Sequence, residues 1–363
     1  MLPVAPLELR QDSASSSSLI YIQYLRALAA LLVIFQHAHE QVAGLRNYMN
    51  TTLGEGGVDL FFVISGFVMM YSTGFKSPSA RSFIFRRLER IVPLYWIMTL
   101  LTASLLLITP QLFRNSAFSI SSLISSLIFF PQRNPGMTQS ISPMLKLGWT
   151  LNYEMFFYVA FALFLAFRPV IRVVGVGFLF GLFFFLQETF NCQYTPILFW
   201  TDSIIFEFLI GCIIGALALS GVFRRASAWI APALAGIGVI CFVAFADAPG
   251  PRLFSAGIPA GLIVAGAAGA ELKCGRNLLS GKFAFLGDAS YSLYLGHLYP
   301  VIAFRVVWDK LSLPQEGVIS AGLFVTACMV TGIFSGIVLY QCVERPIGRS
   351  LRSLRLPARS LTV

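Results

Sequence analysis

The sequence predicts an all-α fold, a polytopic transmembrane helical bundle of about ten spans with one short peripheral or re-entrant helix. Composition is the first observation behind this prediction. Of the 363 residues, 57% are hydrophobic and 12% are charged, and the mean hydropathy is +0.77, whereas soluble domains carry about a quarter charged residues. The second observation is that apolar windows of about 20 residues, enough to cross a hydrocarbon core of about 30 Å, recur from Ile20 to Cys342.

Ten apolar windows are predicted to cross the membrane. They cover residues 20–40, 57–75, 91–109, 149–167, 172–187, 198–219, 228–246, 253–271, 284–306 and 317–342. The apolar piece from Ile120 to Phe130 would form a helix of about 17 Å, well below the thickness of the hydrocarbon core. This piece is therefore predicted to be the peripheral or re-entrant helix.

The distribution of Lys and Arg predicts the orientation, because short cytoplasmic loops are enriched in these residues. With a cytoplasmic N-terminus, 18 of the 26 Lys and Arg residues fall on the cytoplasmic side, and an extra crossing at 120–130 would remove this bias. We therefore expect both termini in the cytoplasm. The domains expected are a cytoplasmic tail at 1–19, a membrane domain at 20–342 with an outer loop at about 110–148, and a basic tail at 343–363 that contacts anionic lipid headgroups.

Composition also excludes some partners and sites. The net charge of +10 follows from the topology and does not indicate a nucleic acid partner. The six cysteines are scattered without a Cys-x-x-Cys pair, so we expect no zinc or redox site and no metal. No internal repeat is visible, which counts against a secondary transporter built from inverted repeats.

The first predicted span carries an arginine and a histidine on one face. Arg26 and His37 are eleven residues apart, which at about 100° and 1.5 Å per residue brings them almost onto one helical line, about 16 Å apart. An ionisable group within a span is a candidate functional site, whereas the alternative for Arg26 is a side chain that reaches back to the interface. We expect this stripe to face the bundle interior and to line a cavity between the two water phases.

A histidine at position 37 suits general-base catalysis, because the ordinary pKa of an imidazole lies near neutrality. It could take the proton of a sugar hydroxyl that attacks a thioester, or carry the acyl group itself. The alternative is a polar residue at the end of a helix. His39 points about 200° away, so it is expected to face solvent or to lie behind His37, whereas Glu40 could orient the ring.

The next two spans contribute an acid and a group of arginines. Asp59, at the outer end of the second span, is predicted either to stabilise the start of the helix or to act beside His37. FIFRRLERIVPLYW places Arg86, Arg87 and Arg90 at the cytoplasmic start of the third span. Topology alone explains such a group, but guanidinium groups at a helix N-terminus also suit the phosphates of an acyl donor such as coenzyme A.

The fourth and ninth spans hold the remaining candidates. Trp149 is an aromatic anchor at the interface or a part of the substrate site. Glu154, in an aromatic stretch, must find a cation or a polar cavity or become neutral, and it is a candidate partner of His37. His297 is a second functional imidazole or a hydrogen-bonded core residue. No role is assigned to two acids of the sixth span, Asp202 and Glu207.

The ordered motifs resemble the acyltransferase 3 family of integral membrane acyltransferases, and most of all its exopolysaccharide O-acetyltransferases. They are YLRALAALLVIFQH, with the family's Arg/Lys-x10-His signature at Arg26 and His37, GVDLFFVISGF, FIFRRLERIVPLYW, WTLNYEMFFY and SYSLYLGH. The resemblance covers nearly the whole chain. In one departure the common Trp-Ser-Leu reads Trp149-Thr150-Leu151, which retains a hydroxyl.

The resemblance implies a ten-helix domain in the inner membrane, a donor such as acetyl-coenzyme A taken from the cytoplasm, and an exported or lipid-linked carbohydrate as acceptor. It also implies that Arg26 and His37 are essential. The expected site has His37, Glu154 and Asp59 as catalytic residues, Arg26 with the three arginines of the third span at the acyl donor, and Trp149 and His297 at the substrate.

Two other classes of function stay open on the sequence alone. The first is a transporter or flippase for a lipid-linked glycan, in which buried Arg, His and Glu side chains form a path. The second is a scaffold without activity in a polysaccharide-synthesis complex. Binding of coenzyme A would separate an acyltransferase from a flippase.

Overall fold

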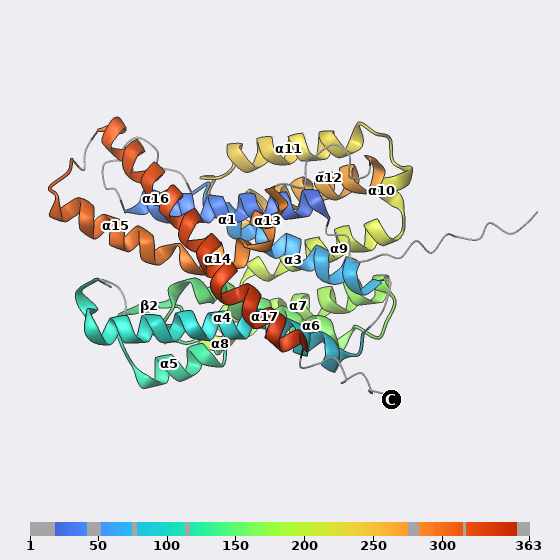
Figure 1. The fold of residues 1–363 in the computed structure, drawn as a ribbon. Coiled ribbons are helices and arrows are strands. Elements are labelled where there is room, and N and C mark those ends of the chain that lie inside the picture. The colour runs from blue at the N-terminus through green and yellow to red at the C-terminus, as the bar shows by residue number, and fades with distance from the viewer. Residues whose placement is uncertain are drawn as a thin grey trace, which may run out of the picture.

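Helices make up almost all of the secondary structure in the computed structural model, which describes residues 19–41, 52–74, 78–112, 117–274, 283–314 and 317–353. Within these residues the one sheet is an antiparallel hairpin of β1 (Arg133–Asn134) and β2 (Met137–Ile141), in which Arg133 pairs with Ile141. Most of the long helices run roughly along one direction (Figure 1). The all-α prediction is confirmed.

Six helical stretches in the described residues are long and apolar enough to cross a membrane. Four are single helices, α1 (Ile20–Glu40), α3 (Gly56–Gly74), α4 (Ala80–Ile108) and α7 (Pro169–Phe190). The other two contain a π-helical turn: η4 (Leu253–Gly257) leads into α12 (Ile258–Cys274), and η7 (Tyr340–Glu344) joins α16 (Val318–Leu339) to α17 (Arg345–Ser353). These stretches indicate a multi-pass membrane protein.

The other helices are shorter. They are α5 (Ile120–Leu127), α6 (Trp149–Leu163), α8 (Thr195–Trp200), α9 (Phe206–Leu219), α10 (Val222–Arg225), α11 (Ile230–Ala244), α13 (Ala284–Asp288), α14 (Ser290–Gly296) and α15 (Leu298–Lys310), with 3-10 turns η1 (Pro110–Leu112), η2 (Lys146–Gly148) and η3 (Ser203–Ile205). Four predicted spans therefore hold a short or interrupted helix. An apolar window reads across breaks such as the one at Ala289, so the count of ten spans stays a prediction.

Two regions differ from the sequence expectation at their boundaries. α4 begins at Ala80 and not at the predicted residue 91, because the hydroxyl of Ser79 caps it by accepting the Ser82 N–H at 3.3 Å. The expected outer loop at 110–148 contains η1, α5, the hairpin and η2. The prediction of a short helix near 120–130 is confirmed by α5, whose Leu127 carbonyl accepts the indole N–H of Trp96 on α4 at 2.9 Å.

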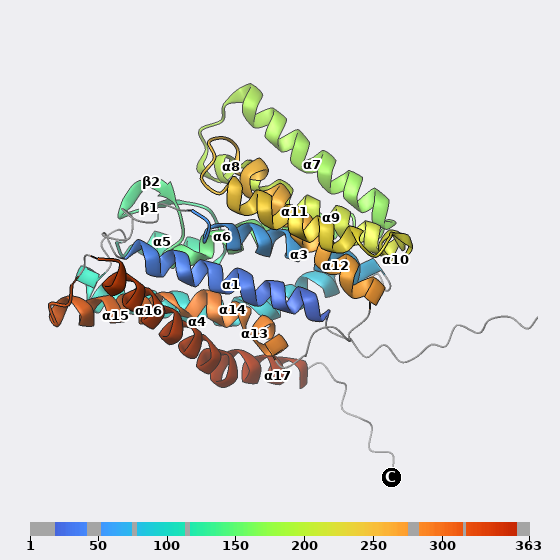
Figure 2. The ribbon, with the colours of Figure 1, turned by 90° about the horizontal axis from the view of Figure 1, so that it is seen from above.

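α1 lies in the middle of the bundle, against α3 on one side and α13, α14 and α16 on another (Figures 1 and 2). The carboxylate of Glu271 on α12 accepts the first N–H groups of α1, those of Ile20 and Tyr21. These groups have no partner within the helix, and a carboxylate also complements the helix dipole. α12, which is distant in the sequence, thus stabilises the start of the helix that carries Arg26 and His37.

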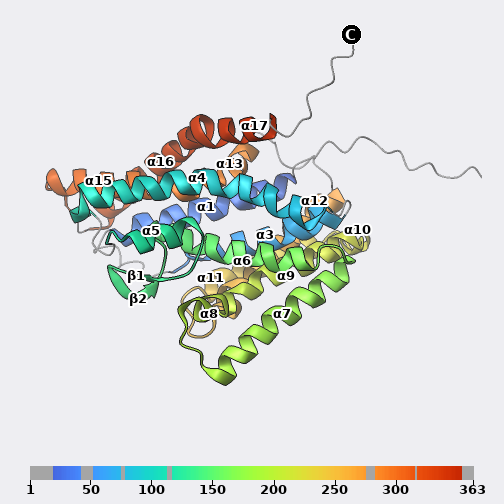
Figure 3. The ribbon, with the colours of Figure 1, turned by 90° about the horizontal axis from the view of Figure 1, so that it is seen from below.

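α3 and α9 pack with their backbones in close contact. A Cβ added at Gly66 would lie 2.0 Å from the carbonyl oxygen of Phe208, and one at Gly211 would lie 2.0 Å from that of Val63. Small residues of this kind allow membrane helices to approach closely. α7, by contrast, lies at the outside of the bundle (Figures 2 and 3), with exposed apolar side chains such as Phe178 that suit contact with lipid.

Candidate active site

Arg26 and His37 lie on one face of α1 and are turned towards α14, as their helical spacing predicts. The Arg26 guanidinium donates to Gln23 Oε1 and to Ser290 Oγ, both at 3.0 Å. The His37 ring faces that of His297, with 5.0 Å between the ring centroids. Ser290 and His297 are two helical turns apart, at the two ends of α14. The face of α1 that carries Arg26 and His37 therefore lies along α14.

A cavity of about 120 Å³ lies beside Arg26, and we call it the inner chamber. Its polar lining comes from α1, α3, α4, α6 and α14 and includes Arg26, Ser65, Arg87, Glu154, Tyr158 and Ser290. Apolar and aromatic side chains such as Phe61 and Phe62 make up most of the rest. A largely apolar chamber with a few converging polar groups is the usual form of a small-molecule site.

Glu154 lies among polar groups in the inner chamber, as expected if its carboxylate had to find a polar cavity. Its Oε1 accepts the hydroxyl of Ser65 at 3.0 Å and the hydroxyl of Tyr158 one helical turn away. Both partners come from motifs that the sequence marked, GVDLFFVISGF and WTLNYEMFFY, but neither was singled out. These hydrogen bonds hold the carboxylate in the same chamber as Arg26 and Arg87.

A second and larger cavity, of about 750 Å³, adjoins the inner chamber, and we call it the vestibule. Arg87 and Arg90 line both cavities, while Arg86 lines the vestibule alone. Arg87 lies over the ring of Phe83 at 5.6 Å, and its buried Nε has no hydrogen-bond partner within the described residues. The three predicted arginines therefore converge on one space, from which the chamber leads towards Arg26.

The hydrogen bonds of the two histidines determine which nitrogen of His37 is available. His297 Nδ1 lies 3.0 Å from the carbonyl of Leu293, which can only accept, so this nitrogen carries the proton when the ring is neutral. His297 Nε2 then accepts from His37 Nδ1 at 3.3 Å, and the same N–H faces the carbonyl of Val33 at 2.9 Å. His37 Nε2 is left with a free lone pair, which is the position of a general base.

The two histidines do not line the inner chamber or the vestibule, so neither cavity has the continuous form expected from the sequence. Tyr294 lies between: it lines the chamber, and its ring centroid is 6.4 Å from that of His297. The Tyr294 hydroxyl donates to the carbonyl of Leu147 and is hydrogen-bonded to Thr150 Oγ1, both at 2.9 Å. The hydroxyl retained in the Trp149-Thr150-Leu151 motif thus holds the side chain that lines the chamber next to His297.

Asp59 lies at the first turn of α3, but the structure pairs it with an arginine and not with His37. Arg252 donates to both carboxylate oxygens of the fully buried Asp59, from Nε at 2.9 Å and from a terminal nitrogen at 2.7 Å. It also pairs with Glu55 at 3.1 Å. Burial alone would lower the pKa of Arg252, but the hydrogen bond and charge of Asp59 outweigh it and raise the pKa above its ordinary value.

Arg252 was missed because its loop looks like an ordinary outer connection in the sequence. The signal that could have identified it is Asp59, since a carboxylate buried in an apolar helix requires a cation nearby. Glu207 lies in the same region, buried beside the Asp59 carboxylate, and within the described residues no backbone N–H or basic side chain donates to either of its oxygens. Asp202 caps η3 by accepting the Ile204 N–H at 2.9 Å.

His39 does not face solvent, which was one of its two sequence alternatives: it is buried and stacks on Phe35 of the same helix with 5.9 Å between the ring centroids. The ring of Trp149 packs edge-on against Tyr153 at 5.9 Å and Phe62 at 6.4 Å, and both of its sequence alternatives stay predictions. In the described part of the chain no group of His, Cys, Asp and Glu could hold a metal ion.

The family model described as an acyltransferase domain matches residues 19–340 of the chain. The exopolysaccharide production protein ExoZ of Rhizobium meliloti is 34% identical over 310 residues, which cover 85% of this chain and 93% of that relative. The acyltransferase MdmB of Streptomyces mycarofaciens is 27% identical, with 90% and 91% of the two chains covered.

The peptidoglycan O-acetyltransferase OatA of Listeria monocytogenes is 26% identical, and the match covers 91% of this chain but only 56% of that relative. No solved structure matches the chain. The family model covers most of the chain, and the relatives are matched over nearly its whole length. The chain therefore belongs to the acyltransferase 3 family of integral membrane acyltransferases.

Proposed function

We propose that the chain is a membrane O-acyltransferase that moves an acyl group, acetyl in the first instance, from acyl-coenzyme A to a hydroxyl of a cell-surface or exported carbohydrate. The observation that carries the proposal is the order of polar groups along the two cavities. Three arginines surround the vestibule, and Arg26 and Glu154 follow in the inner chamber. A donor with phosphates at one end of a linear arm and a thioester at the other matches this order.

The donor binds in the same order. Its phosphates contact Arg86, Arg87 and Arg90, whose guanidinium groups match phosphate geometry. Its pantetheine arm enters the inner chamber past Arg26. Because Tyr294 lies between the chamber and the histidines, this side chain turns aside when the thioester reaches His37, at the cost of its hydrogen bonds to Thr150 and Leu147.

His37 then acts as the base. Its Nε2 takes the proton of the acceptor hydroxyl while that oxygen attacks the thioester carbonyl, and the tetrahedral intermediate expels the thiolate of coenzyme A. The thiolate takes the proton back from the imidazolium, so the products are an ester and free coenzyme A. His297 is a positioning residue in this scheme, because its Nε2 accepts a hydrogen bond from the His37 Nδ1–H and so leaves His37 Nε2 free.

The remaining predicted residues contribute unequally to this proposal. Glu154 stays a candidate for a supporting role, because it lies in the chamber with Arg26. The geometry favours a structural role for Asp59, whose carboxylate is occupied by Arg252. Trp149, at the start of α6, remains the candidate contact for the acceptor.

The relatives support the choice of acceptor and the setting. ExoZ is named as an exopolysaccharide production protein and matches the chain over 93% of its own length, so an exported polysaccharide is the acceptor proposed first. The proposal retains ten crossings of the inner membrane with both termini in the cytoplasm. One feature supports this orientation: the start of α4 and the basic helix α17 line the same vestibule, as two cytoplasmic segments would.

Two measurements test the proposal. In a strain that lacks this gene, the exported polysaccharide should regain its acyl groups, measured by mass, with the wild-type protein but not with His37→Ala. Purified protein in detergent should bind coenzyme A, for which a flippase would have no use. Equal acylation with both proteins would refute the assignment of His37, and unchanged polymer yield in the deletion strain would argue against a scaffold.

A further inference from the structure

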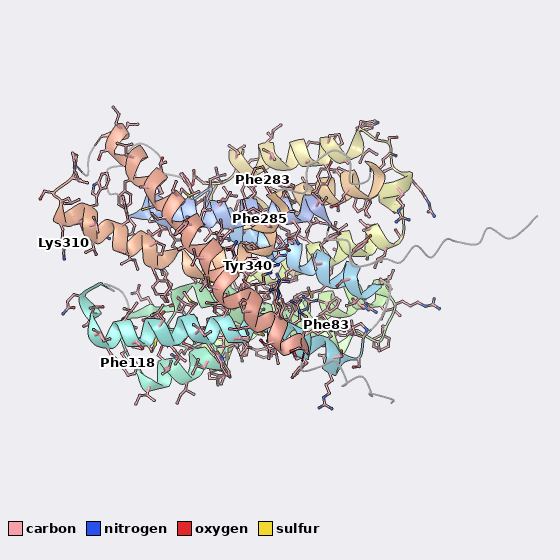
Figure 4. The ribbon with its side chains drawn as sticks, in the orientation of Figure 1. Phe83, Phe118, Phe283, Phe285, Lys310 and Tyr340 are labelled. Carbon is pink, nitrogen blue, oxygen red and sulfur yellow. The ribbon has the colours of Figure 1, made fainter. Side chains whose placement is uncertain are left out.

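The C-terminal helix forms one wall of the vestibule. α17 continues from α16 through the π-helical turn η7, and it lies opposite the arginine-rich start of α4. Tyr340 and Glu344 of η7 and Arg345 and Arg352 of α17 line the vestibule (Figure 4 labels Tyr340). The sequence assigned this basic segment to lipid headgroups, but the fold turns part of it towards the vestibule.

Two arginines of α17 face the vestibule and a third does not. Arg345 and Arg352 are two helical turns apart, so they lie on the same side of the helix. Gly348 lies between them in the lining, and a Cβ added there would meet nothing closer than an Arg352 nitrogen at 3.9 Å. Arg349 is not a lining residue, although it has the same charge and lies in the same helix. The chain therefore offers its own matched control.

The vestibule holds more positive than negative charge. Five arginines line it, three from α4 and two from α17, against three acids, Glu89, Asp288 and Glu344. None of these five arginines forms an ion pair within the part of the chain that the structure describes. The Glu344 carboxylate instead accepts the hydroxyl of Ser292. Guanidinium groups that converge on one space without acidic partners are suited to a ligand with several negative charges.

The size of the vestibule and the burial of Arg87 also indicate a ligand. A volume of about 750 Å³ falls within the range of about 300–1,000 Å³ usual for small-molecule sites. Arg87 Nε, buried and without a hydrogen-bond partner in the described residues, is a donor that costs free energy while it stays unpaired. A phosphate in the vestibule would supply the missing acceptor.

We propose that Arg345 and Arg352 bind phosphates of the nucleotide part of the acyl donor, opposite Arg86, Arg87 and Arg90, so that α17 is a wall of the donor site. This inference rests on the proposed function. The nucleotide part of coenzyme A carries a diphosphate and a 3′-phosphate, which suits arginines on two facing helices. Lipid headgroups also carry phosphates, so the experiment must separate the two sources.

The test measures the Kd of coenzyme A for the full-length protein in detergent by titration calorimetry. The double variant Arg345→Ala/Arg352→Ala should bind about 10–100-fold more weakly, because hydrogen bonds between charged groups are lost. Arg349→Ala should stay within about twofold of the wild type, because it removes the same charge outside the vestibule. The double variant should also discriminate less between coenzyme A and dephospho-coenzyme A, which lacks the 3′-phosphate.

A second arm tests the lipid alternative, in nanodiscs of phosphatidylcholine with or without phosphatidylglycerol. The inference would be wrong if the double variant and the wild type had the same Kd for coenzyme A without phosphatidylglycerol and differed in Kd only when this lipid was present. α17 would then be a lipid contact. If the wild type did not bind coenzyme A at all, the proposed function itself would fail.

A folding control completes the test. The melting temperature of each variant shows whether it is folded. If the double alanine variant does not fold, Arg345→Lys/Arg352→Lys decides the matter, since lysine keeps the charge but loses the bidentate geometry. Its Kd should rise by about 3–10-fold, and an unchanged Kd would count against phosphate binding by these two residues.

Discussion

Two groups of buried charges in this membrane domain are organised in different ways. In the cavity cluster of Arg26, Arg87 and Glu154, Arg26 and Glu154 are hydrogen-bonded to neutral side chains such as Ser290 and Ser65, Arg87 lies over the ring of Phe83, and no ion pair joins the three within the described residues. In the ion-pair cluster of Asp59, Arg252 and Glu55, opposite charges meet directly at 2.7 and 3.1 Å. A paired charge is already compensated, whereas a charge that contacts only neutral groups can still bind a charged or polar ligand.

This difference separates binding from structural roles. The cavity cluster lies in a chamber that continues into the vestibule, and it is where the donor is proposed to bind. The ion-pair cluster joins α3 to the turn before η4, far apart in the sequence. We therefore expect substitutions in or beyond the chamber to reduce activity in a folded protein, and substitutions in the ion-pair cluster to reduce stability.

The largest expected effect is that of His37→Ala. Removal of a general base costs about 10²–10⁴-fold in rate, so acyl transfer should fall by about 10³-fold. Because the ring is hydrogen-bonded to His297, the melting temperature of the variant must be measured as well, to show that the protein is folded. The rate of acyl transfer is measured on purified protein with acetyl-coenzyme A. Wild-type activity in this variant would remove His37 from the mechanism and leave the chamber without its proposed chemistry.

Arg252→Ala should have the largest effect on stability. It leaves the fully buried Asp59 carboxylate unpaired, which costs about 3 kcal/mol, at the low end of the range for a broken buried pair because Arg252 is 31% exposed. Denaturant or thermal unfolding in detergent measures the loss. The control is Arg305→Ala, which breaks the more exposed pair with Asp309 and a hydrogen bond to Gln41 and should cost about 1–2 kcal/mol. Equal losses of stability in the two variants would show that the ion-pair cluster contributes no more than an exposed ion pair.

His297→Leu should reduce activity by about 10–100-fold with a smaller effect on stability. The substitution removes one of the two acceptors of the His37 N–H, the one at 3.3 Å, and leaves the Val33 carbonyl at 2.9 Å, so the ring keeps its tautomer but is held less firmly in its orientation. His297→Gln carries an amide oxygen that can accept the same N–H, and it should recover part of the rate. If Gln and Leu were equally inactive, His297 would not act through this hydrogen bond.

The smallest effect is expected at Thr150. Thr150→Val removes the hydroxyl that holds Tyr294 and should change the KM for the donor by about 3–10-fold, with kcat less affected. Thr150→Ser keeps the hydroxyl and should behave like the wild type within about twofold. A change in kcat alone would place Thr150 in the chemical step and not in the closure of the chamber.

The sequence predicted much of the fold and part of the site because both depend on local patterns. The periodicity of α1 correctly brought Arg26 and His37 onto one face, and the composition correctly indicated a helical membrane protein. The number of spans did not follow as securely, because one apolar window can hold several short helices, as the window at 284–306 holds α13, α14 and most of α15. The burial of His39 did not follow either, since it depends on packing that a projection of one helix does not include.

The sequence by itself determined the class of the protein, its family and the helical stripe that carries its candidate chemistry, because hydropathy and helical periodicity are properties of one continuous segment of chain. Only the tertiary structure decided the partners: His297 with His37, Arg252 with Asp59, and α17 with the start of α4. These partners are separated by 190 residues or more. Which faces of distant helices meet depends on side-chain packing across the whole bundle, and no local pattern encodes it.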